Sequence, residues 1–222
     1  MIRAVVFDFD GVLVESVDVK TQAFAALFAE HGEQIVRQVV AYHLANGGIS
    51  RVQKFKHYYE RFLGQPLSTE TLQHLCERFR ELVLDQVLRA DFVSGVPAVL
   101  ESIHRSGHLM FIASGTPEEE LRHIVEKRGL AGLFHGVYGS PVCKPELLRK
   151  IESSNGLHSR EMVFIGDSLT DFAAAQAANT HFIARLSPGS TVDWNLYSVP
   201  VVANLEELQE ILSGQGASRQ IP

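Results

Sequence analysis

The stretch "MIRAVVFDFDGVLVES", residues 1–16, decides the fold of this chain. Residues Ile2 to Phe9 are apolar almost without interruption and rich in β-branched side chains. This pattern predicts a strand that is covered on both faces, as in a parallel sheet. The run ends in two acids, Asp8 and Asp10, and Gly11 follows at once. A strand needs no acids to fold, so we expect these carboxylates to serve something that happens at its end.

Further apolar runs and helical patterns alternate along the rest of the chain. The alternation predicts an α/β fold, a doubly wound parallel sheet with helices on both faces. The expected strands cover 109–113, 162–165, 181–184 and, more weakly, 199–202, with a short strand-like stretch at 136–139; the clearest helical patterns between them cover 96–104, 118–128 and 172–178.

Residues 16–91 differ from the rest because they contain helical patterns without a convincing strand. Amphipathic helices are expected at 19–30, 34–45, 51–62 and 71–88, separated by glycine-containing breaks. We therefore predict an all-helical cap domain at 16–91, inserted into an α/β core made of 1–15 and 92–213, and a flexible tail at 214–222. Hinges for cap motion are expected near 14–16 and 91–94.

Composition narrows the class of protein. The chain has 222 residues, of which 45% are hydrophobic and 21% charged, and this predicts a folded globular protein. A net charge of -6 without a basic run predicts no nucleic-acid partner. We find no signal peptide or apolar span, which predicts a cytoplasmic protein without a membrane partner, and Cys76 and Cys143 are expected to be reduced. The oligomeric state is not predictable from the sequence.

The second expected strand runs into the sequence "FIASGTPEEE". Thr116, Pro117 and Glu119 have the spacing of a helix start, with Thr as N-cap and Glu closing a capping box. This interpretation places Ser114 and Gly115 at the positive end of a helix, where free backbone N–H groups favour a phosphate. The alternative is that Ser-Gly only makes a tight turn.

Lys144 in "GSPVCKPELL" is expected to lie in a loop, just before a helix that starts at Pro145. This loop could face the same crevice beyond the sheet. A lone lysine is more often a solvated surface charge, so the interpretation depends on the other motifs.

The sequence "MVFIGDSLTDFAAAQAA" adds two more acids after a strand, Asp167 and Asp171. Asp171 could merely stabilise the first turn of a helix. Asp167 adds a third carboxylate at the edge where parallel strands end. Clustered carboxylates of this kind suit a hard cation such as Mg²⁺.

Together, "DFDGVLVES", "ASGTP", the Lys of "CKPE" and "GDSLTD" resemble the haloacid dehalogenase-like superfamily. They follow the order of that family and span nearly the whole core. The helical insert resembles the capped subgroup that includes phosphoglycolate phosphatases and β-phosphoglucomutases. Departures are a shorter lysine loop and Asn179, which stands where a Gly often follows the Ala-rich helix.

The resemblance implies a phosphoryl-transfer mechanism. Asp8 would be the nucleophile that becomes an aspartyl phosphate, and Asp10 would protonate the leaving oxygen and then activate water. An acid at Asp10 favours phosphoryl transfer over dehalogenation, because a leaving halide needs no proton. The resemblance also implies a Mg²⁺ site made of the Asp8 side chain, Asp167 and the backbone carbonyl of Asp10, with Asp171 supporting the site. It further implies that Ser114, Gly115 and Lys144 bind the phosphate.

The cap sequence "GGISRVQKFKHYYE" resembles a cap loop of β-phosphoglucomutases, which implies that Arg51 contacts a substrate phosphate. The alternative is an N-cap at Ser50 followed by solvated Arg51, Lys54 and Lys56. Lys20 departs from the histidine that those mutases carry in the first cap helix. We therefore expect a Mg²⁺-dependent phosphatase of a small phosphate ester, with a hexose-phosphate mutase and, remotely, a non-catalytic binding protein as alternatives.

Overall fold

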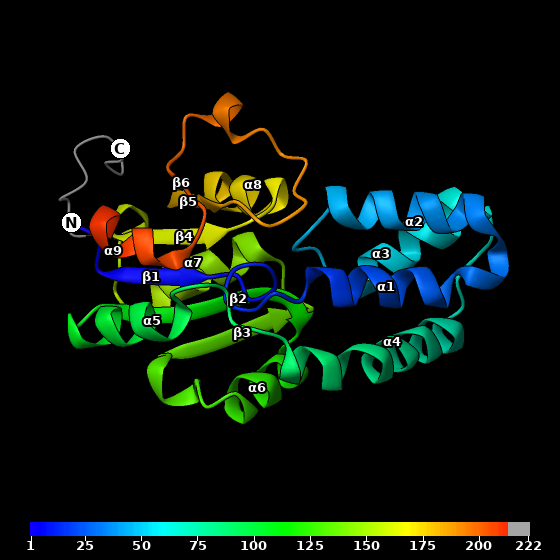
Figure 1. Ribbon diagram of the computed structural model, residues 1–222, viewed down its shortest axis with the longest axis horizontal. Coiled ribbons are helices and arrows are strands. Elements are labelled where there is room, and N and C mark those ends of the chain that lie inside the picture. The colour runs from blue at the N-terminus through cyan, green and yellow to red at the C-terminus, as the bar shows by residue number, and fades with distance from the viewer. Residues whose placement is uncertain (213–222) are drawn as a thin grey trace.

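The computed structural model describes residues 1–212, which form a six-stranded parallel sheet in the order β3-β2-β1-β4-β5-β6 (Figure 1). Each strand overlaps an expected run, although β2 ends four residues later than expected and β3, β4 and β5 each end one residue later, and the predicted α/β class is confirmed. The tail expected at 214–222 lies outside the described residues. The strands are β1 (Ala4–Phe7), β2 (Leu109–Pro117), β3 (Gly136–Ser140), β4 (Met162–Gly166), β5 (His181–Arg185) and β6 (Val201–Val202).

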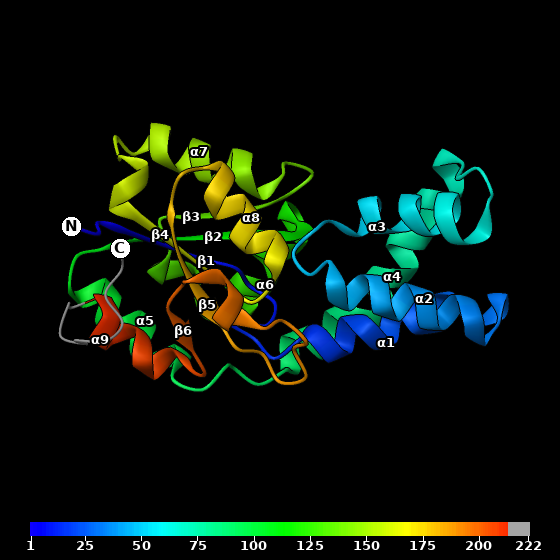
Figure 2. The same cartoon turned by 90° about the horizontal axis from the view of Figure 1, so that it is seen from above.

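Strand β1 lies in the middle of the sheet and is buried throughout. Its side chains alternate: Val5 and Phe7 pack into the apolar cluster on one face, and Ala4 and Val6 into the cluster on the other. Helices therefore cover both faces (Figure 2). On the first face lie α5 (Val96–Arg105), α6 (Glu118–Lys127) and α9 (Leu208–Leu212), and on the second α7 (Lys144–Ser154) and α8 (Leu169–Ala177).

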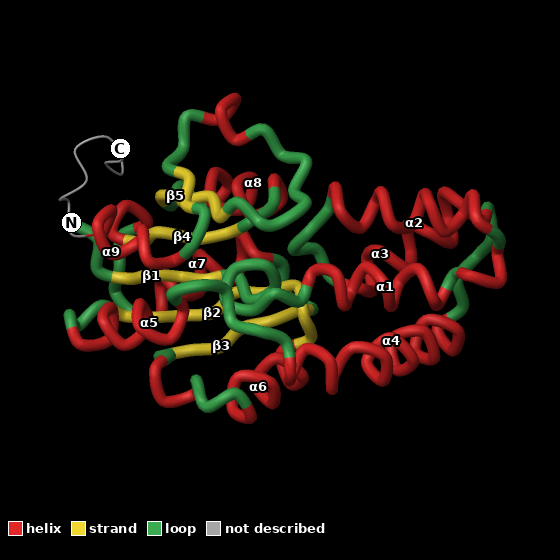
Figure 3. Tube along the Cα trace, viewed as in Figure 1, coloured by secondary structure: helices red, strands yellow, loops and turns green. Residues whose placement is uncertain are grey.

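Residues 16–91, which lie between β1 and α5, are helical, as expected, and extend beyond the carboxyl ends of the strands (Figure 3). We call this segment, residues 16–91, the cap; these domain boundaries stay a prediction. Phe24 anchors an aromatic core of the cap, with ring centroids 4.3 Å from Phe79 and 5.6 Å from Phe55. The helices are α1 (Val17–Leu27), α2 (Glu33–Ala45), α3 (Arg51–His57), which continues as a π-helix at Tyr58–Leu63, and α4 (Thr69–Arg89).

Short 3₁₀-helices occur in the connections, at Ala29–His31 in the cap and at Ala131–Leu133, Ser159–Glu161, Trp194–Tyr197 and Leu205–Glu207 in the rest of the chain.

The two segments that join the cap to the sheet run side by side. The backbone N–H of Glu15 donates to Asp91 at 3.0 Å, and that of Val93 donates to Leu13 at 3.1 Å. These are the segments in which the sequence predicts hinges. The two connecting segments are therefore hydrogen-bonded to each other. Cap motion about them stays a prediction.

The expected helix start at Thr116 is wrong. Strand β2 continues through Pro117, which pairs with Ser140, and α6 begins at Glu118 without a side-chain cap. The Thr116 hydroxyl is instead bonded to Asp10 and Lys20, so it is not free to cap the helix and no capping box with Glu119 forms.

Candidate active site

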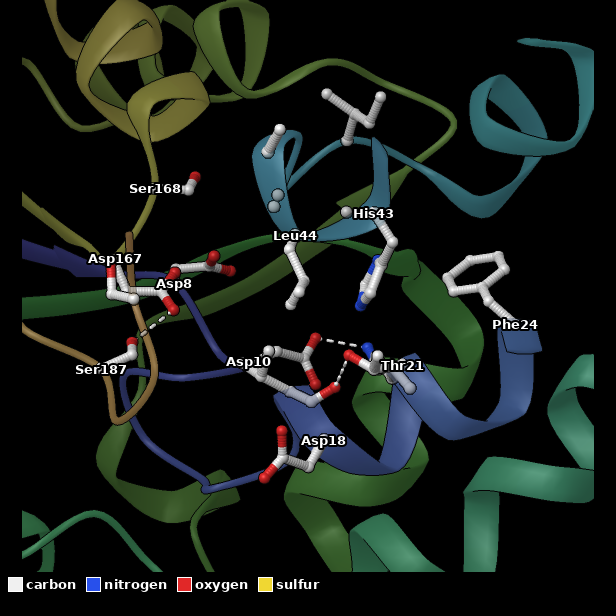
Figure 4. A pocket seen from close by; sticks show the side chains of 18 of the residues that line it. Asp8, Asp10, Asp18, Thr21, Phe24, His43, Leu44, Asp167, Ser168 and Ser187 are labelled. Carbon is white, nitrogen blue, oxygen red and sulfur yellow. Dashed lines mark hydrogen bonds and ion pairs between the residues drawn. The ribbon is translucent and has the colours of Figure 1, made fainter. Parts of the chain in front are cut away.

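Three carboxylates meet where β1 and β4 end. Asp8 follows β1, Asp167 follows β4, and Asp171 lies in the first turn of α8. Because β1 and β4 are parallel neighbours in register, their carboxyl ends reach the same edge of the sheet. One oxygen of each carboxylate lies within 4.8 Å of the others. Figure 4 shows Asp8 and Asp167 close together, as the strand pattern predicts.

Gly11, which follows Asp10, is required at its position for steric reasons. Gly11 has a φ of +74°, a left-handed conformation that favours glycine. A Cβ atom there would also lie 2.1 Å from Oδ2 of Asp167. The loop after Asp10 can therefore close onto the acid cluster only with glycine at this position.

Lys144 lies inside the acid cluster, but the expected loop around it is wrong. It is the first residue of α7, which begins one residue before Pro145, and Cys143 occupies the N-cap position without a side-chain capping hydrogen bond. Its Nζ lies 2.6 Å from Oδ2 of Asp8 and 2.5 Å from Oδ1 of Asp171. This buried ammonium therefore links Asp8, which follows β1, to the first turn of α8.

The cap closes over Lys144 through Gly48. A Cβ at Gly48 would lie 2.7 Å from the lysine Nζ, and the φ of Gly48 is +72°. Beside it, the Thr170 hydroxyl donates to the carbonyl of Gly47. The glycine pair that the sequence shows as a helix break is the point where the cap backbone contacts the site.

With all three carboxyls ionised, the acid cluster would carry more negative charge than Lys144 offsets, and this opposes their ionisation. Burial raises the pKa of Asp8 to about 8, and the neighbouring Asp171 and Asp167 charges act in the same direction against Lys144. Burial, and then the charge of Asp171, raises the pKa of Asp167 to about 7. Three hard oxygen donors facing a single ammonium fit a divalent cation, which would offset this repulsion.

Asp10 lines the same cavity but is not part of the acid cluster, and it has polar partners of its own. Its carboxylate accepts hydrogen bonds from Ser16 at 2.6 Å and from Thr116 at 3.1 Å, and it forms an ion pair with Lys20. Burial alone would raise the pKa of Asp10, but the Lys20 charge and these hydrogen bonds outweigh burial and lower it. In this arrangement Asp10 is held ionised.

Ser114 and Gly115 line the same cavity as Asp8 and Asp10, and this cavity has a volume of about 200 Å³. Ser114 is buried, and its hydroxyl accepts a hydrogen bond from the N–H of Thr116 at 3.2 Å. The expected phosphate-binding pair therefore lies at the site, although extended strand rather than a helix end presents it.

At the cap side of the cavity, Ser50 caps α3 as expected, by accepting a hydrogen bond from the N–H of Gln53. The alternative interpretation, in which all three basic residues of α3 are solvated, holds only for Lys56. Lys56 is exposed, whereas Arg51 and Lys54 are buried. Nη2 of Arg51 lies 2.5 Å from Oε1 of Glu120 in α6. This ion pair joins cap and core, and a contact of Arg51 with substrate stays a prediction.

We expect Glu120→Gln to lower the free energy of unfolding by up to about 3 kcal/mol, because it leaves the Arg51 guanidinium buried without a counter-charge. Glu119→Gln, on the exposed neighbouring residue, is the matched control and should change it by less than about 0.5 kcal/mol. Chemical denaturation measures both. Equal effects would show that the Arg51–Glu120 pair does not hold the cap to the core.

Several side chains that hold the site residues were not predicted to do so. Ser16, which ends the motif "DFDGVLVES" and precedes α1, and Lys20 in α1 both hold Asp10, and only the one-turn spacing between them hinted that they share a face. Ser187 donates to Oδ2 of Asp167 at 2.6 Å from the loop after β5, and no sequence signal pointed to it.

An α/β sheet with an acid cluster at its carboxyl edge and a helical cap above it defines a hydrolase-type site. The model of the family "Haloacid dehalogenase-like hydrolase" matches residues 5–185. The chain belongs to this family, and the predicted resemblance is confirmed.

Relatives of known description agree with this family. A phosphoglycolate phosphatase from Photobacterium profundum is 28% identical, over 91% of this chain and 89% of its own length. One from Yersinia pseudotuberculosis is 29% identical, over 80% and 78%. The β-phosphoglucomutase structure from Clostridium difficile shares the fold with a TM-score of 0.76 at 18% identity, covering 95% of this chain and 96% of its own. Family and relatives together confirm the prediction of a phosphatase.

Within residues 1–212, no helix is both long enough and apolar enough to cross a membrane.

Proposed function

We propose that this phosphatase hydrolyses a small phosphate monoester through an aspartyl phosphate on Asp8, with Mg²⁺ as its cofactor. The observation that carries the proposal is the placement of Asp8, Asp10 and Asp167 around one cavity, with the Lys144 ammonium 2.6 Å from Asp8 and Asp171 beside them. The cavity volume of about 200 Å³ suits a small metabolite rather than a polymer. A cytoplasmic location stays a prediction.

In the first step, an oxygen of Asp8 attacks phosphorus and the ester P–O bond breaks. Asp10 gives its proton to the departing alkoxide oxygen. The negative charge of a bound phosphate opposes the effect of Lys20 and raises the pKa of Asp10, which allows Asp10 to carry that proton. Ser114, the Gly115 N–H and Lys144 hold the phosphoryl oxygens.

In the second step, water attacks phosphorus and gives a proton to Asp10, and the bond between phosphorus and Asp8 breaks. Lys20, Ser16 and Thr116 favour ionised Asp10 and therefore suit it to the base role. The side chains of Asp8 and Asp167 and the backbone carbonyl of Asp10 would hold Mg²⁺, with Asp171 in support. When bound, the metal supplies positive charge that offsets repulsion between carboxylate and phosphate.

The experiment is an assay of a panel of glycolate, sugar and nucleotide monophosphates, with Mg²⁺ or with EDTA. We expect Mg²⁺-dependent phosphate release from a phosphoglycolate-like acid or a sugar phosphate. Isomer formation from β-glucose 1-phosphate without phosphate release would instead establish the mutase. Absence of both reactions would favour a binding protein.

We expect Mg²⁺ binding to release protons and to weaken by about 10- to 100-fold from pH 8 to pH 6.5. The pKa values of Asp8 and Asp167 are raised to about 8 and about 7 without metal, so both carboxyls increasingly hold protons as pH falls through this window. Calorimetry at pH 6.5, in buffers of different ionisation enthalpy, measures the released protons.

Asp18→Asn is the control for this titration, because Asp18 is an exposed carboxylate at the rim of the same cavity. It should leave both the affinity and the proton release unchanged, whereas Asp167→Asn should weaken binding. A pH-independent affinity would contradict a metal site made of these carboxyls.

A further inference from the structure

Lys54 is a buried lysine in the cap wall of the cavity. It is 3% exposed, and its Nζ lies 2.7 Å from Nδ1 of His43 and 5.5 Å from the centroid of the Phe24 ring. Burial, followed by the charge of Lys54, lowers the pKa of His43 to about 2, so the imidazole is neutral and accepts a hydrogen bond from the lysine. The ammonium therefore has polar and aromatic neighbours but no counter-charge from them.

Three other cations lie at the site, Lys20 and Arg51 in the cavity wall and Lys144 beside Asp8, and each already has a carboxylate partner. Lys20 pairs with Asp10, Lys144 with Asp8 and Asp171, and Arg51 with Glu120. Along the described part of the chain, residues 1–212, no carboxylate lies within ion-pair distance of Lys54.

Arg51 makes further contacts within the protein. Its guanidinium lies 4.7 Å from the centroid of the Phe79 ring, and Nη1 is 3.5 Å from the carbonyl of Cys76, in addition to the contact with Glu120. An incoming anion would have to displace Glu120 to pair with Arg51. Lys54, one turn further along the same helix, needs no such exchange.

A buried charge without a partner is costly, and an anionic group of a ligand at this position would complete the pair. Burial, with Lys20 as the next cause, lowers the pKa of Lys54 to about 7, and a bound anion would act in the opposite direction. The phosphate that reacts is assigned to Asp8, Ser114 and Lys144 at the sheet side. An anion at Lys54 is therefore a second one, held at the cap side.

We propose that Lys54, held in place by His43, binds a second anionic group of the substrate, a carboxylate or a second phosphate. This inference rests on the proposed phosphatase function and narrows its substrates to small phosphorylated acids or bisphosphates. It also moves the cap-side anion contact from Arg51 to Lys54, and leaves Arg51 with the joining of cap to core.

The test compares matched pairs of esters that differ only in the second anion. One pair is 2-phosphoglycolate and 2-hydroxyethyl phosphate, and the other is propane-1,3-diol bisphosphate and 3-hydroxypropyl phosphate. The wild type should prefer the anionic member of at least one pair in kcat/KM. Lys54→Met should reduce that preference about 100-fold and change the neutral ester little.

Two matched variants separate this role from a structural one. Lys56→Met, at the exposed lysine of the same helix, should leave the preference intact. Arg51→Gln should lower kcat/KM for both members of a pair equally. The inference is overturned if the wild type shows no preference, if Lys54→Met affects both members equally, or if Arg51→Gln abolishes the preference instead.

The pair that shows the preference identifies the anion as carboxylate or phosphate. Calorimetric binding of the same compounds to Asp8→Asn, which is not expected to turn them over, tests Lys54 independently of catalysis. Anion-selective binding that Lys54→Met removes in this background would support the site even if no ester is hydrolysed, which would defeat only the proposed function. Equal binding of both members of each pair would overturn the site.

Discussion

Asp8→Asn is expected to lower phosphate release by at least about 10⁴-fold, the largest effect of any substitution in this chain. The amide has nearly the shape of the carboxylate but cannot form the acyl phosphate. Lys144 still pairs with Asp171 in this variant, so its buried ammonium keeps a carboxylate partner and α7 stays joined to α8. Steady-state phosphate release at saturating Mg²⁺ measures the loss, and circular dichroism checks the fold.

The control is Asp18→Asn, the same chemical change on an exposed acid at the cavity rim. It should keep activity within about 3-fold of the wild type, as expected for a surface position. A comparable loss in both variants, or substantial turnover by Asp8→Asn, would remove Asp8 from the role of nucleophile.

Asp10→Asn is expected to lower turnover of alkyl phosphates by about 10²- to 10⁴-fold, the range that general acid–base catalysis contributes. An aryl ester separates the two steps, because nitrophenolate leaves without needing a proton. With p-nitrophenyl phosphate, Asp8 should still be phosphorylated, while water is no longer activated by Asp10. A burst of nitrophenolate close to one equivalent per active site should then precede a slow steady state.

Stopped-flow absorbance measures that burst, and Asp8→Asn should show none. If Asp10→Asn turned over the aryl ester as fast as the wild type and without a burst, Asp10 would not be the base of the second step. If alkyl esters were unaffected, it would not be the acid of the first.

The sheet edge of the site was predictable because it depends on backbone topology. Parallel strands that follow one another through right-handed crossovers end at the same edge, so acids after two apolar runs lie at that edge and meet where the two strands are neighbours. Asp8 and Asp167 are placed in this way by the pairing of β1 with β4. Whether a segment forms a strand or a helix was predictable for most of the chain from its local apolar pattern.

The cap side was less predictable because it depends on side chains that meet across long stretches of sequence. Arg51 and Lys54 lie on one helix with similar local patterns, yet only Arg51 has an acid opposite it, 69 residues later. Thr116 has the sequence of a helix cap, but the Asp10 carboxylate and Lys20 engage its hydroxyl. Tertiary hydrogen bonds of this kind override a local capping preference of about 1 kcal/mol.

The most direct test of the account is chemical trapping of the phosphorylated enzyme. Asp10→Asn would be mixed with substrate, quenched within the burst and reduced with borohydride, which converts an aspartyl phosphate to homoserine. Mass spectrometry of the peptide that contains residues 4–11 should find this conversion at position 8, and Asp8→Asn should show none. Turnover without any modification at position 8, or with phosphate on another residue, would contradict the proposed mechanism.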